Sequence, residues 1–337
     1  MSHVMSRAVF DALNTHAWSD GVIAAAAMDQ RGSLKRALQS AGMSEVNDAD
    51  LRTFKRLVVE ALSPHASSVL LDPTWGDEAA AARADGCGLL YAYEKSGYDT
   101  RTEGRQGELL PGASVRRLVE GGATGIKLLV YYAPDHADDV NDVKHALVER
   151  VGAECTQVGV PLFLEPVTYD DDADAVTTAR RRPERIRGIV EEFSKDRYGV
   201  DVLKVEYPVD PKFTTGLAGG SDAVHDLEAA RDALLAVDEA AARPYIFLSA
   251  GVDMDVFETM LGHAGETGID FAGVLCGRAT WKGGIAAYAQ GGADALRRFM
   301  DDEGVPNIET LNRAIAANAK PWWTVYGGRD AIRLEPT

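Results

Sequence analysis

DVLKVEYP (residues 201–208) is a short, largely apolar run that carries one lysine, Lys204, near its centre. Its β-branched residues and the proline that ends it predict a buried strand. An unpaired ammonium group is costly to bury. Lys204 therefore needs either an ion-pair partner, such as Glu206, or a lowered pKa that leaves the amine neutral and nucleophilic. This segment alone favours the ion pair, because lysines with a shifted pKa also occur in structural networks.

Seven other runs of similar length and composition occur along the chain. Each is bounded by Gly, Pro or polar residues, and amphipathic or Ala-rich stretches separate one run from the next. This alternation predicts a parallel sheet of the α/β class, and eight repeats predict its closure into a (β/α)8 TIM barrel. An open doubly wound sheet is the alternative, but no G-x-G-x-x-G motif follows the first run. The predicted strands are Val22–Asp29, Ser68–Pro73, Gly88–Glu94, Gly125–Tyr132, Val160–Val167, Asp201–Pro208, Pro244–Gly251 and Phe271–Trp281.

Helical patterns fill most intervals between the predicted strands and continue after the last one. We expect residues 1–337 to form a single barrel domain, with an N-terminal extension over residues 1–20 and C-terminal helices and a tail over residues 284–337. The Trp and Tyr residues of this tail are expected to pack on the core or on a subunit contact. The predicted helices are Asp50–Leu62, His136–Val151, Thr177–Lys195, Ser221–Ala241, Asp253–His263, Gly284–Met300 and Asn307–Ala319.

Two stretches that follow predicted strands read as long loops. They are Lys95–Gly112, which contains Arg101 and Arg105, and Val209–Gly220. Long loops on this side of a barrel often serve as lids or binding loops, so both are candidates to border the active site.

The formal net charge of −17 and the cysteine content limit the expected partners and location. Nucleic acids and anionic membranes both require a basic face, so we expect neither as a partner. An anionic substrate would need a local concentration of Lys and Arg. Three widely spaced cysteines without a C-x-x-C pair argue against disulfides and favour a cytoplasmic protein. We identify no apolar run of the length that a membrane span needs.

Polar residues lie at the C-terminal ends of the predicted strands, where TIM barrels carry their active sites. If side chains alternate along each strand, Lys127, Glu165 and Lys204 all face the barrel interior. A second ammonium group beside Lys204 would favour its neutral form, and Glu165 could then transfer protons or simply pair with a lysine. Core packing requires none of these residues. The polar strand-end residues are Asp29, Gln30, Asp72, Glu94, Lys95, Lys127, Glu165, Lys204, Glu206, Ser249 and Arg278.

The seventh and eighth predicted strands end in the motifs LSAG and CGR. Barrels often bind phosphate at the loops after these two strands, where small residues let backbone N–H groups approach an anion. An arginine adds a bidentate donor, although Arg278 could instead pair with Glu206. We favour phosphate binding because it supplies the local positive charge that an anionic substrate demands. The predicted anion site consists of Ser249, Gly251, Gly277 and Arg278.

The sequence favours an active site without a metal. None of the seven histidines lies at the end of a predicted strand, so a zinc ion would find no imidazole ligands there. Asp29, Asp72 and Glu94 could hold a magnesium ion, which remains the alternative. We therefore expect a site that works without a metal and without a cofactor.

Six segments occur in order along the predicted strands and together carry a family resemblance. They are MDQRG (28–32), LLDP (70–73), AYEKSGYD (92–99), FLEP (163–166), LKVE (203–206) and LCGRATW (275–281). On these segments the chain resembles the class I tagatose 1,6-bisphosphate aldolases, over about residues 21–281. The resemblance implies a metal-independent carbon–carbon lyase. Its reaction would be the reversible cleavage of a ketohexose 1,6-bisphosphate to dihydroxyacetone phosphate and glyceraldehyde 3-phosphate.

The resemblance also implies a role for each matching residue. Lys204 corresponds to the Schiff-base lysine and Glu165 to the acid/base carboxylate. Asp29 and Lys127 correspond to residues around the imine. The predicted substrate-binding and phosphate-binding residues are Gln30, Ser249, Gly251, Gly277 and Arg278.

The resemblance does not decide the substrate, and it leaves open which cation pairs with Glu206. A related branch of the superfamily cleaves sulfofructose 1-phosphate, in which a sulfonate replaces the distal phosphate. A different class of function is a sugar-phosphate-binding regulatory protein without turnover, although intact Lys204 and Glu165 favour the enzyme.

With Lys204 assigned to chemistry, Glu206 is expected to pair with Lys127 or Arg278. The expected partner is a phosphorylated ketose, and the sequence is compatible with a homo-oligomer.

Overall fold

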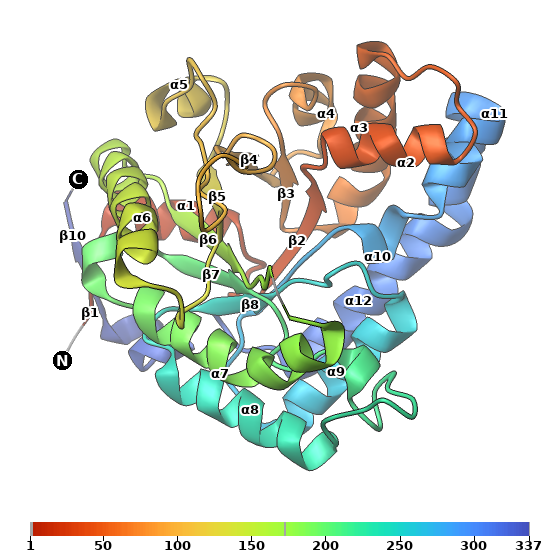
Figure 1. Cartoon of the computed structure of the whole chain (residues 1–337). Coiled ribbons are helices and arrows are strands. Elements are labelled where there is room, and N and C mark those ends of the chain that lie inside the picture. Colours follow the sequence, from red (N-terminus) through yellow and green to blue (C-terminus); the bar gives the residue numbers. More distant parts are fainter. Residues whose placement is uncertain (1–2, 172, 337) are drawn as a thin grey trace.

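Eight parallel strands form a closed barrel at the centre of the molecule (Figure 1). The computed structural model describes residues 3–171 and 173–336. The last barrel strand pairs with the first, so the predicted TIM barrel is confirmed and the open sheet is wrong. Gly273 permits this closure, because a Cβ atom there would overlap the carbonyl oxygen of Ile23. The barrel strands are β2 Ile23–Met28, β3 Ser68–Leu71, β4 Gly88–Ala92, β5 Gly125–Tyr131, β6 Leu162–Val167, β7 Val202–Val205, β8 Tyr245–Phe247 and β9 Gly273–Cys276.

Helices surround the barrel and cover its outer face (Figure 1). The seven predicted helices are present with shifted ends. The helix predicted to begin at Ser221 begins at Leu227 instead, because the side chain of Asp226 caps its start and Ser221 does not. None of the described helices has both the length and the apolar character that crossing a bilayer requires. The helices around the barrel are α2 Gly32–Ser40, α3 Asp48–Leu62, α4 Asp77–Ala82, α5 Val115–Glu120, α6 Asp138–Val158, α7 Ala175–Phe193, α8 Leu227–Ala240, α9 Met254–Thr267, α10 Arg278–Trp281, α11 Gly284–Phe299 and α12 Val305–Asn318.

The barrel interior is apolar along most of its length and becomes polar at one end. Alternate residues of each strand point inward, as the period of two requires, and the small alanines of β2 fit the crowded centre. Phe163 and Val202 belong to this apolar interior. Two residues further along the same strands, Glu165 and Lys204 continue the inward face into a cavity.

The N-terminal end of the barrel is closed by both ends of the chain. Helix α1 (Arg7–Thr15) and the C-terminal tail bring Phe10, Leu13 and Trp322 into one apolar cluster with the barrel interior. Strand β1 (His3–Ser6) pairs in parallel with β10 (Ile332–Glu335), and the two strands lie together at one edge of the molecule in Figure 1. Trp322 is 1% exposed, which confirms the expectation that the aromatic tail packs on the core. The open end of the barrel is therefore the C-terminal end of the strands.

Candidate active site

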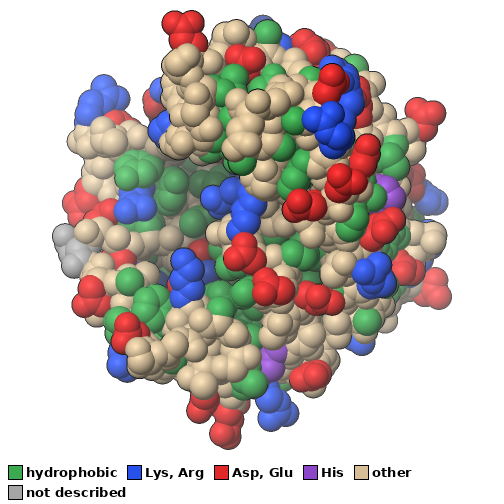
Figure 2. All heavy atoms as spheres, turned by 90° about the vertical axis from the view of Figure 1, so that its right-hand side faces the viewer, with side chains coloured by type: hydrophobic (Ala, Val, Ile, Leu, Met, Phe, Trp, Pro, Cys, Tyr) green, Lys and Arg blue, Asp and Glu red, His purple; other side chains and the backbone are tan. Residues whose placement is uncertain are grey.

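A cavity of about 540 Å³ opens at the C-terminal ends of the barrel strands. Figure 2 shows a hollow on this face of the molecule, with Lys and Arg side chains at its edge. The four predicted catalytic residues line the cavity, and so do all five predicted binding residues. The sequence therefore identified residues that meet at this mouth, although they come from strands spread along the chain from β2 to β9.

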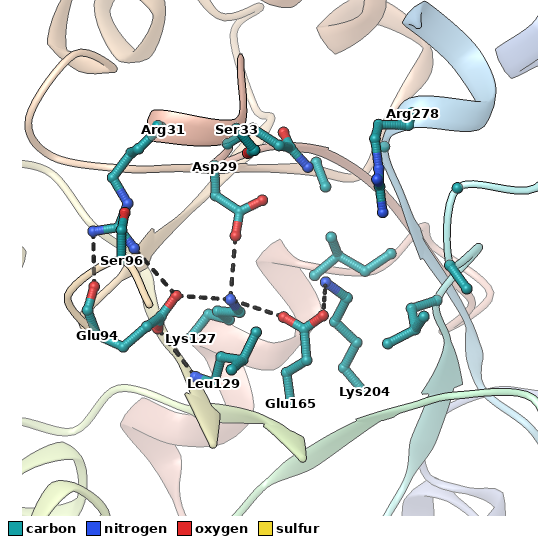
Figure 3. Close-up of a pocket in the computed structure, with 18 of the residues that line it drawn as sticks. Asp29, Arg31, Ser33, Glu94, Ser96, Lys127, Leu129, Glu165, Lys204 and Arg278 are labelled. Carbon is teal, nitrogen blue, oxygen red and sulfur yellow. Dashed lines mark hydrogen bonds and ion pairs between the residues drawn. The ribbon is translucent and has the colours of Figure 1, made fainter. Parts of the chain in front are cut away.

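Lys127 is the centre of the polar network in this cavity (Figure 3). Its Nζ atom lies 2.8 Å from Glu94 Oε1, 2.8 Å from Glu165 Oε2 and 3.1 Å from Asp29 Oδ2. Burial disfavours the charged amine, but Glu165, Glu94 and Asp29 outweigh it and raise the pKa of Lys127 well above its ordinary value. Lys127 therefore remains an ammonium group at neutral pH.

The same network shifts the pKa of Asp29 in the opposite direction, to a lower value. Burial would raise its pKa, but the charges of Lys127 and Lys204 hold the pKa well below the usual range of a carboxyl group. About 16% of the side chain is exposed to the cavity. Asp29 is thus an acceptor that is ionised at neutral pH and faces the space a substrate would fill.

Lys204 and Glu165 form the second pair of the network. Lys204 Nζ lies 2.8 Å from Glu165 Oε1, and 6% of the lysine side chain is exposed. Glu165 stands between the two amines, with one oxygen toward each (Figure 3). The lysines are thus linked by a shared carboxylate, where the sequence had suggested two adjacent ammonium groups. Both expectations for Glu165, an ion pair with a lysine and a place beside the nucleophile, are compatible with this geometry.

Glu94 belongs to the network but was missing from the predicted catalytic residues. Besides Lys127, its carboxylate accepts a hydrogen bond from the backbone N–H of Leu129 at 3.0 Å. The guanidinium of Arg31 lies 3.5 Å from the same carboxylate and donates to the Glu94 carbonyl at 2.8 Å. The position of Glu94 at the end of the third predicted strand indicated that it could reach the active site. The sequence cannot show, however, which cation the carboxylate of Glu94 contacts.

Glu206 lies away from the network, and its expected pairing with Lys127 or Arg278 is wrong. Its carboxylate lies 3.0 Å from Arg182 on α7 and accepts hydrogen bonds from the N–H and hydroxyl groups of Thr168. The alternation that predicted an inward side chain fails because β7 ends at Val205. Glu206 thus anchors the segment after β6 to helix α7.

The loops after β8 and β9 form one wall of the cavity. Ala250 and Gly251 both adopt left-handed backbone conformations, with φ of 49° and 81°. Such a conformation is strained for alanine and persists only where surrounding contacts impose it. A Cβ atom on Gly251 would lie 2.9 Å from Arg278 Cζ, so the glycine lets the guanidinium pack against the loop. Arg278 is exposed at this wall, opposite Arg31 in Figure 3.

The N-terminus of helix α2, which the sequence did not predict, also borders the cavity, after β2, the barrel neighbour of β9. Gly32 and Ser33 line the cavity there, together with Arg36. No side chain hydrogen bond caps this helix start, which leaves its first N–H groups for a ligand. Gln30 also lines the cavity, and its amide oxygen is buried without a donor among the described residues.

The magnesium alternative required three carboxylates to converge, and the structure separates them. Asp72 is fully buried, with an oxygen 2.7 Å from Lys55 Nζ. Asp29 and Glu94 instead face Lys127. Within residues 3–171 and 173–336, no group of three or more His, Cys, Asp or Glu side chains is placed to hold a metal ion.

A sequence model of the DeoC/LacD family aldolases matches residues 23–283. The chain belongs to the DeoC/LacD aldolase family, and it is a carbon–carbon lyase.

Curated relatives define the branch of this family. The chain is 43% identical over 333 residues to the tagatose 1,6-diphosphate aldolase of Listeria monocytogenes, covering 98% of each protein. It is 45% identical over 319 residues to the tagatose 1,6-diphosphate aldolase 2 of Enterococcus faecalis, covering 94% of this chain and 95% of the relative. The similarity to tagatose 1,6-bisphosphate aldolases that six short segments indicated therefore extends over nearly the whole chain.

Solved structures share the fold at low sequence identity. The fructose-bisphosphate aldolase of Plasmodium falciparum superposes with a TM-score of 0.69 at 12% identity, over 94% of this chain and 97% of that one. An archaeal fructose 1,6-bisphosphate aldolase gives a TM-score of 0.55 at 15% identity, over 94% of this chain and 99% of that one. Both confirm the aldolase barrel as the architecture.

Proposed function

We propose that this aldolase uses the class I, Schiff-base mechanism on tagatose 1,6-bisphosphate or a closely related ketohexose bisphosphate. The observation that carries the proposal is the pair of Lys204 and Glu165 at the cavity mouth, with the carboxylate shared by Lys127. A nucleophilic amine needs a base that takes its proton, and Glu165 is within hydrogen-bonding distance. The names of the relatives support the choice of substrate.

The first half of the reaction forms the imine. Glu165 takes a proton from Lys204, whose lone pair then attacks the C2 carbonyl and forms a C–N bond. The carbinolamine loses its hydroxyl group as water, with the proton returned by Glu165. Lys127 stays charged throughout, because three carboxylates hold its proton. It therefore keeps its ion pair with Glu165 and holds that carboxylate in place beside Lys204.

The second half breaks the carbon–carbon bond. A carboxylate removes the C4 hydroxyl proton, the C3–C4 bond breaks, and its electron pair moves into the protonated imine. Glyceraldehyde 3-phosphate leaves as the aldehyde and an enamine remains on Lys204. Protonation at C3 and hydrolysis then release dihydroxyacetone phosphate. Asp29 remains ionised and is suited to hold substrate hydroxyl groups in position during these steps.

The charge of the cavity walls supports a substrate with an anionic group at each end. Arg278 and the strained loop of Ala250 and Gly251 form one wall. Arg31 lies on the other side of the network in Figure 3, and the start of α2 with Arg36 also lines the cavity. A protein with a net charge of −17 can bind an anionic substrate only where positive groups are concentrated locally. Such groups lie on two sides of the catalytic network.

The test is a cleavage screen with tagatose, fructose and sorbose 1,6-bisphosphates and sulfofructose 1-phosphate, each with and without EDTA. We expect triose phosphate release from tagatose 1,6-bisphosphate at a rate that EDTA does not change. Activity that disappears with EDTA and returns with a divalent metal would contradict the mechanism. Preference for sulfofructose 1-phosphate would place the enzyme in the sulfonate branch. Ligand binding without any triose release would support the non-catalytic alternative, which membership in an aldolase family disfavours.

A further inference from the structure

The long loop after β4 folds back on itself as a hairpin arm, which we define as residues 94–109. Lys95 N–H donates to the Glu108 carbonyl at 2.7 Å, and Asp99 N–H donates to the Gln106 carbonyl at 2.9 Å. The base of the arm carries Glu94 of the catalytic network, and residues 95–97 line the cavity. The position of the arm therefore shapes the substrate cavity.

One side chain near the tip of the arm, Arg105, docks into a cluster of aromatic rings. Its guanidinium carbon lies 5.2 Å from the ring centre of Tyr98, 5.6 Å from that of Tyr131 and 4.7 Å from that of Tyr169. The guanidinium also lies 2.6 Å from the carboxylate of Asp171. Cation–π contacts and a charge-assisted ion pair thus join the arm, strand β5 and the segment after β6 through one residue.

The backbone of the arm is adapted to this docking. Arg105 has a left-handed conformation with φ of 51°, which is uncommon for an arginine. Gly104 before it is also left-handed, and a Cβ atom there would overlap Val140 on α6. Gln106 after it donates to the carbonyl oxygen of Val140 at 2.9 Å. A strained residue between two close contacts indicates that the docked position is specifically maintained.

The docked cluster continues into the cavity wall through Tyr131. This residue lies on the inward face of β5, four positions after Lys127, and lines the cavity. Its ring packs edge-on against Tyr98 at 5.1 Å and against Tyr169 at 6.1 Å. Arg105 therefore holds a wall of the substrate cavity in place without lining the cavity itself.

We propose that Arg105 is a positioning residue, which fixes the hairpin arm and Tyr131 against bound substrate and so controls substrate affinity. Lys204 and Glu165 are on β7 and β6, which are separate elements from the arm. The kinetic test rests on the proposed function, because it uses the proposed substrate. The docking of the arm is independent of that function.

The kinetic test compares Arg105→Ala and Arg105→Lys with Arg101→Ala, using tagatose 1,6-bisphosphate. Arg101 is the matched control, since it lies on the same arm and its side chain is 83% exposed. Because the lost contacts act on bound substrate and transition state alike, we expect KM to rise about tenfold in Arg105→Ala with kcat within about twofold. The lysine variant keeps the charge near Asp171 and should restore part of the affinity. Arg101→Ala should match the wild type.

A second readout works without turnover. Trypsin cleavage after Arg101 should be about tenfold faster in Arg105→Ala than in the wild type, since a released arm opens locally more often. If the wild type cleaves no ketose bisphosphate, the proposed function fails while this readout still decides the role of Arg105. Should Arg105→Ala not fold, Asp171→Asn removes only the ion pair, and a KM rise of about threefold is expected. Unchanged cleavage with unchanged KM, or a parallel loss of kcat and thermal stability, would overturn the proposal.

Discussion

The two ends of the barrel bury different kinds of side chain although the same eight strands supply both. At the N-terminal end, Phe10 and Trp322 pack against each other with ring centres 5.5 Å apart and close the interior. At the C-terminal end, Lys127 and Lys204 share Glu165 beside an open cavity. The comparison teaches that one end of these strands serves stability and the other holds costly buried charges for chemistry.

Removal of the proposed nucleophile should have the largest effect and should act on activity alone. Lys204→Met keeps the length of the side chain but has no amine, so we expect kcat to fall by a factor on the order of 10⁴ or more. Lys212→Met is the matched control, because Lys212 follows the same strand but is exposed. Steady-state kinetics with thermal melting checks both variants. Full activity of the Lys204 variant would refute the assignment.

Removal of the aromatic plug should act on stability alone. Trp322→Ala leaves a cavity beneath the barrel and should lower the free energy of unfolding by about 4 kcal/mol. Trp323→Ala should cost less, since Trp323 is partly exposed. Urea unfolding measures the loss, and kcat at low temperature should match the wild type. A Trp322 variant that loses kcat without losing stability would break the division between the two ends.

Neutralising the shared carboxylate should reduce the rate by about a hundredfold or more. Glu165→Gln keeps the shape of the side chain but removes the base next to Lys204, so kcat should fall on the order of 10² to 10³ with little change in KM. Glu206→Gln is the matched control, because Glu206 is equally buried but pairs with Arg182. This control should retain kcat and still form the imine. Equal losses in the two variants would contradict a special role for Glu165.

Two aspartates at opposite ends of the barrel should give opposite pH dependence. Near the N-terminal end, burial raises the pKa of Asp201 to about 7. Because this value lies above the unfolded pKa, the contribution of Asp201 to stability is present below about pH 4 and is lost as the pH rises to about 7. Asp201→Asn should therefore be clearly more stable than the wild type at about pH 8, and this advantage should vanish in acid.

Asp29 at the cavity should show the reverse behaviour. Its pKa is lowered in the fold, so its contribution is present above about pH 4 and is lost as the pH falls further. The stability of Asp29→Asn should decline less steeply in acid than that of the wild type. Denaturant unfolding across the pH range checks both aspartates. Parallel profiles for the wild type and either variant would show that the two ends do not differ electrostatically.

Much of the fold could be predicted because its main feature repeats. Eight apolar runs separated by helical patterns fixed the barrel, and strand alternation placed Lys127, Glu165 and Lys204 on its inner face. Short elements without a repeat were missed. The pairing of β1 with β10 brings His3 opposite Ile332, and neither strand has a pattern that indicates so distant a partner.

The site was predicted as a set of residues but less well as a set of contacts. Strand ends reveal which polar side chains meet, whereas the choice of partner depends on where each strand stops. Glu206 turns outward because β7 ends at Val205, three residues before the predicted strand end at Pro208, and Glu94 turns inward to Lys127. The docking of Arg105 depends on the path of an irregular loop, which no periodic pattern describes.

Borohydride trapping tests the central claim most directly. The wild-type enzyme is incubated with dihydroxyacetone phosphate, reduced with sodium borohydride, digested and mapped by mass spectrometry. The account predicts one reduced adduct, located on Lys204 and absent from Lys204→Met. An adduct on Lys127 instead, or full aldolase activity without any adduct, would contradict it.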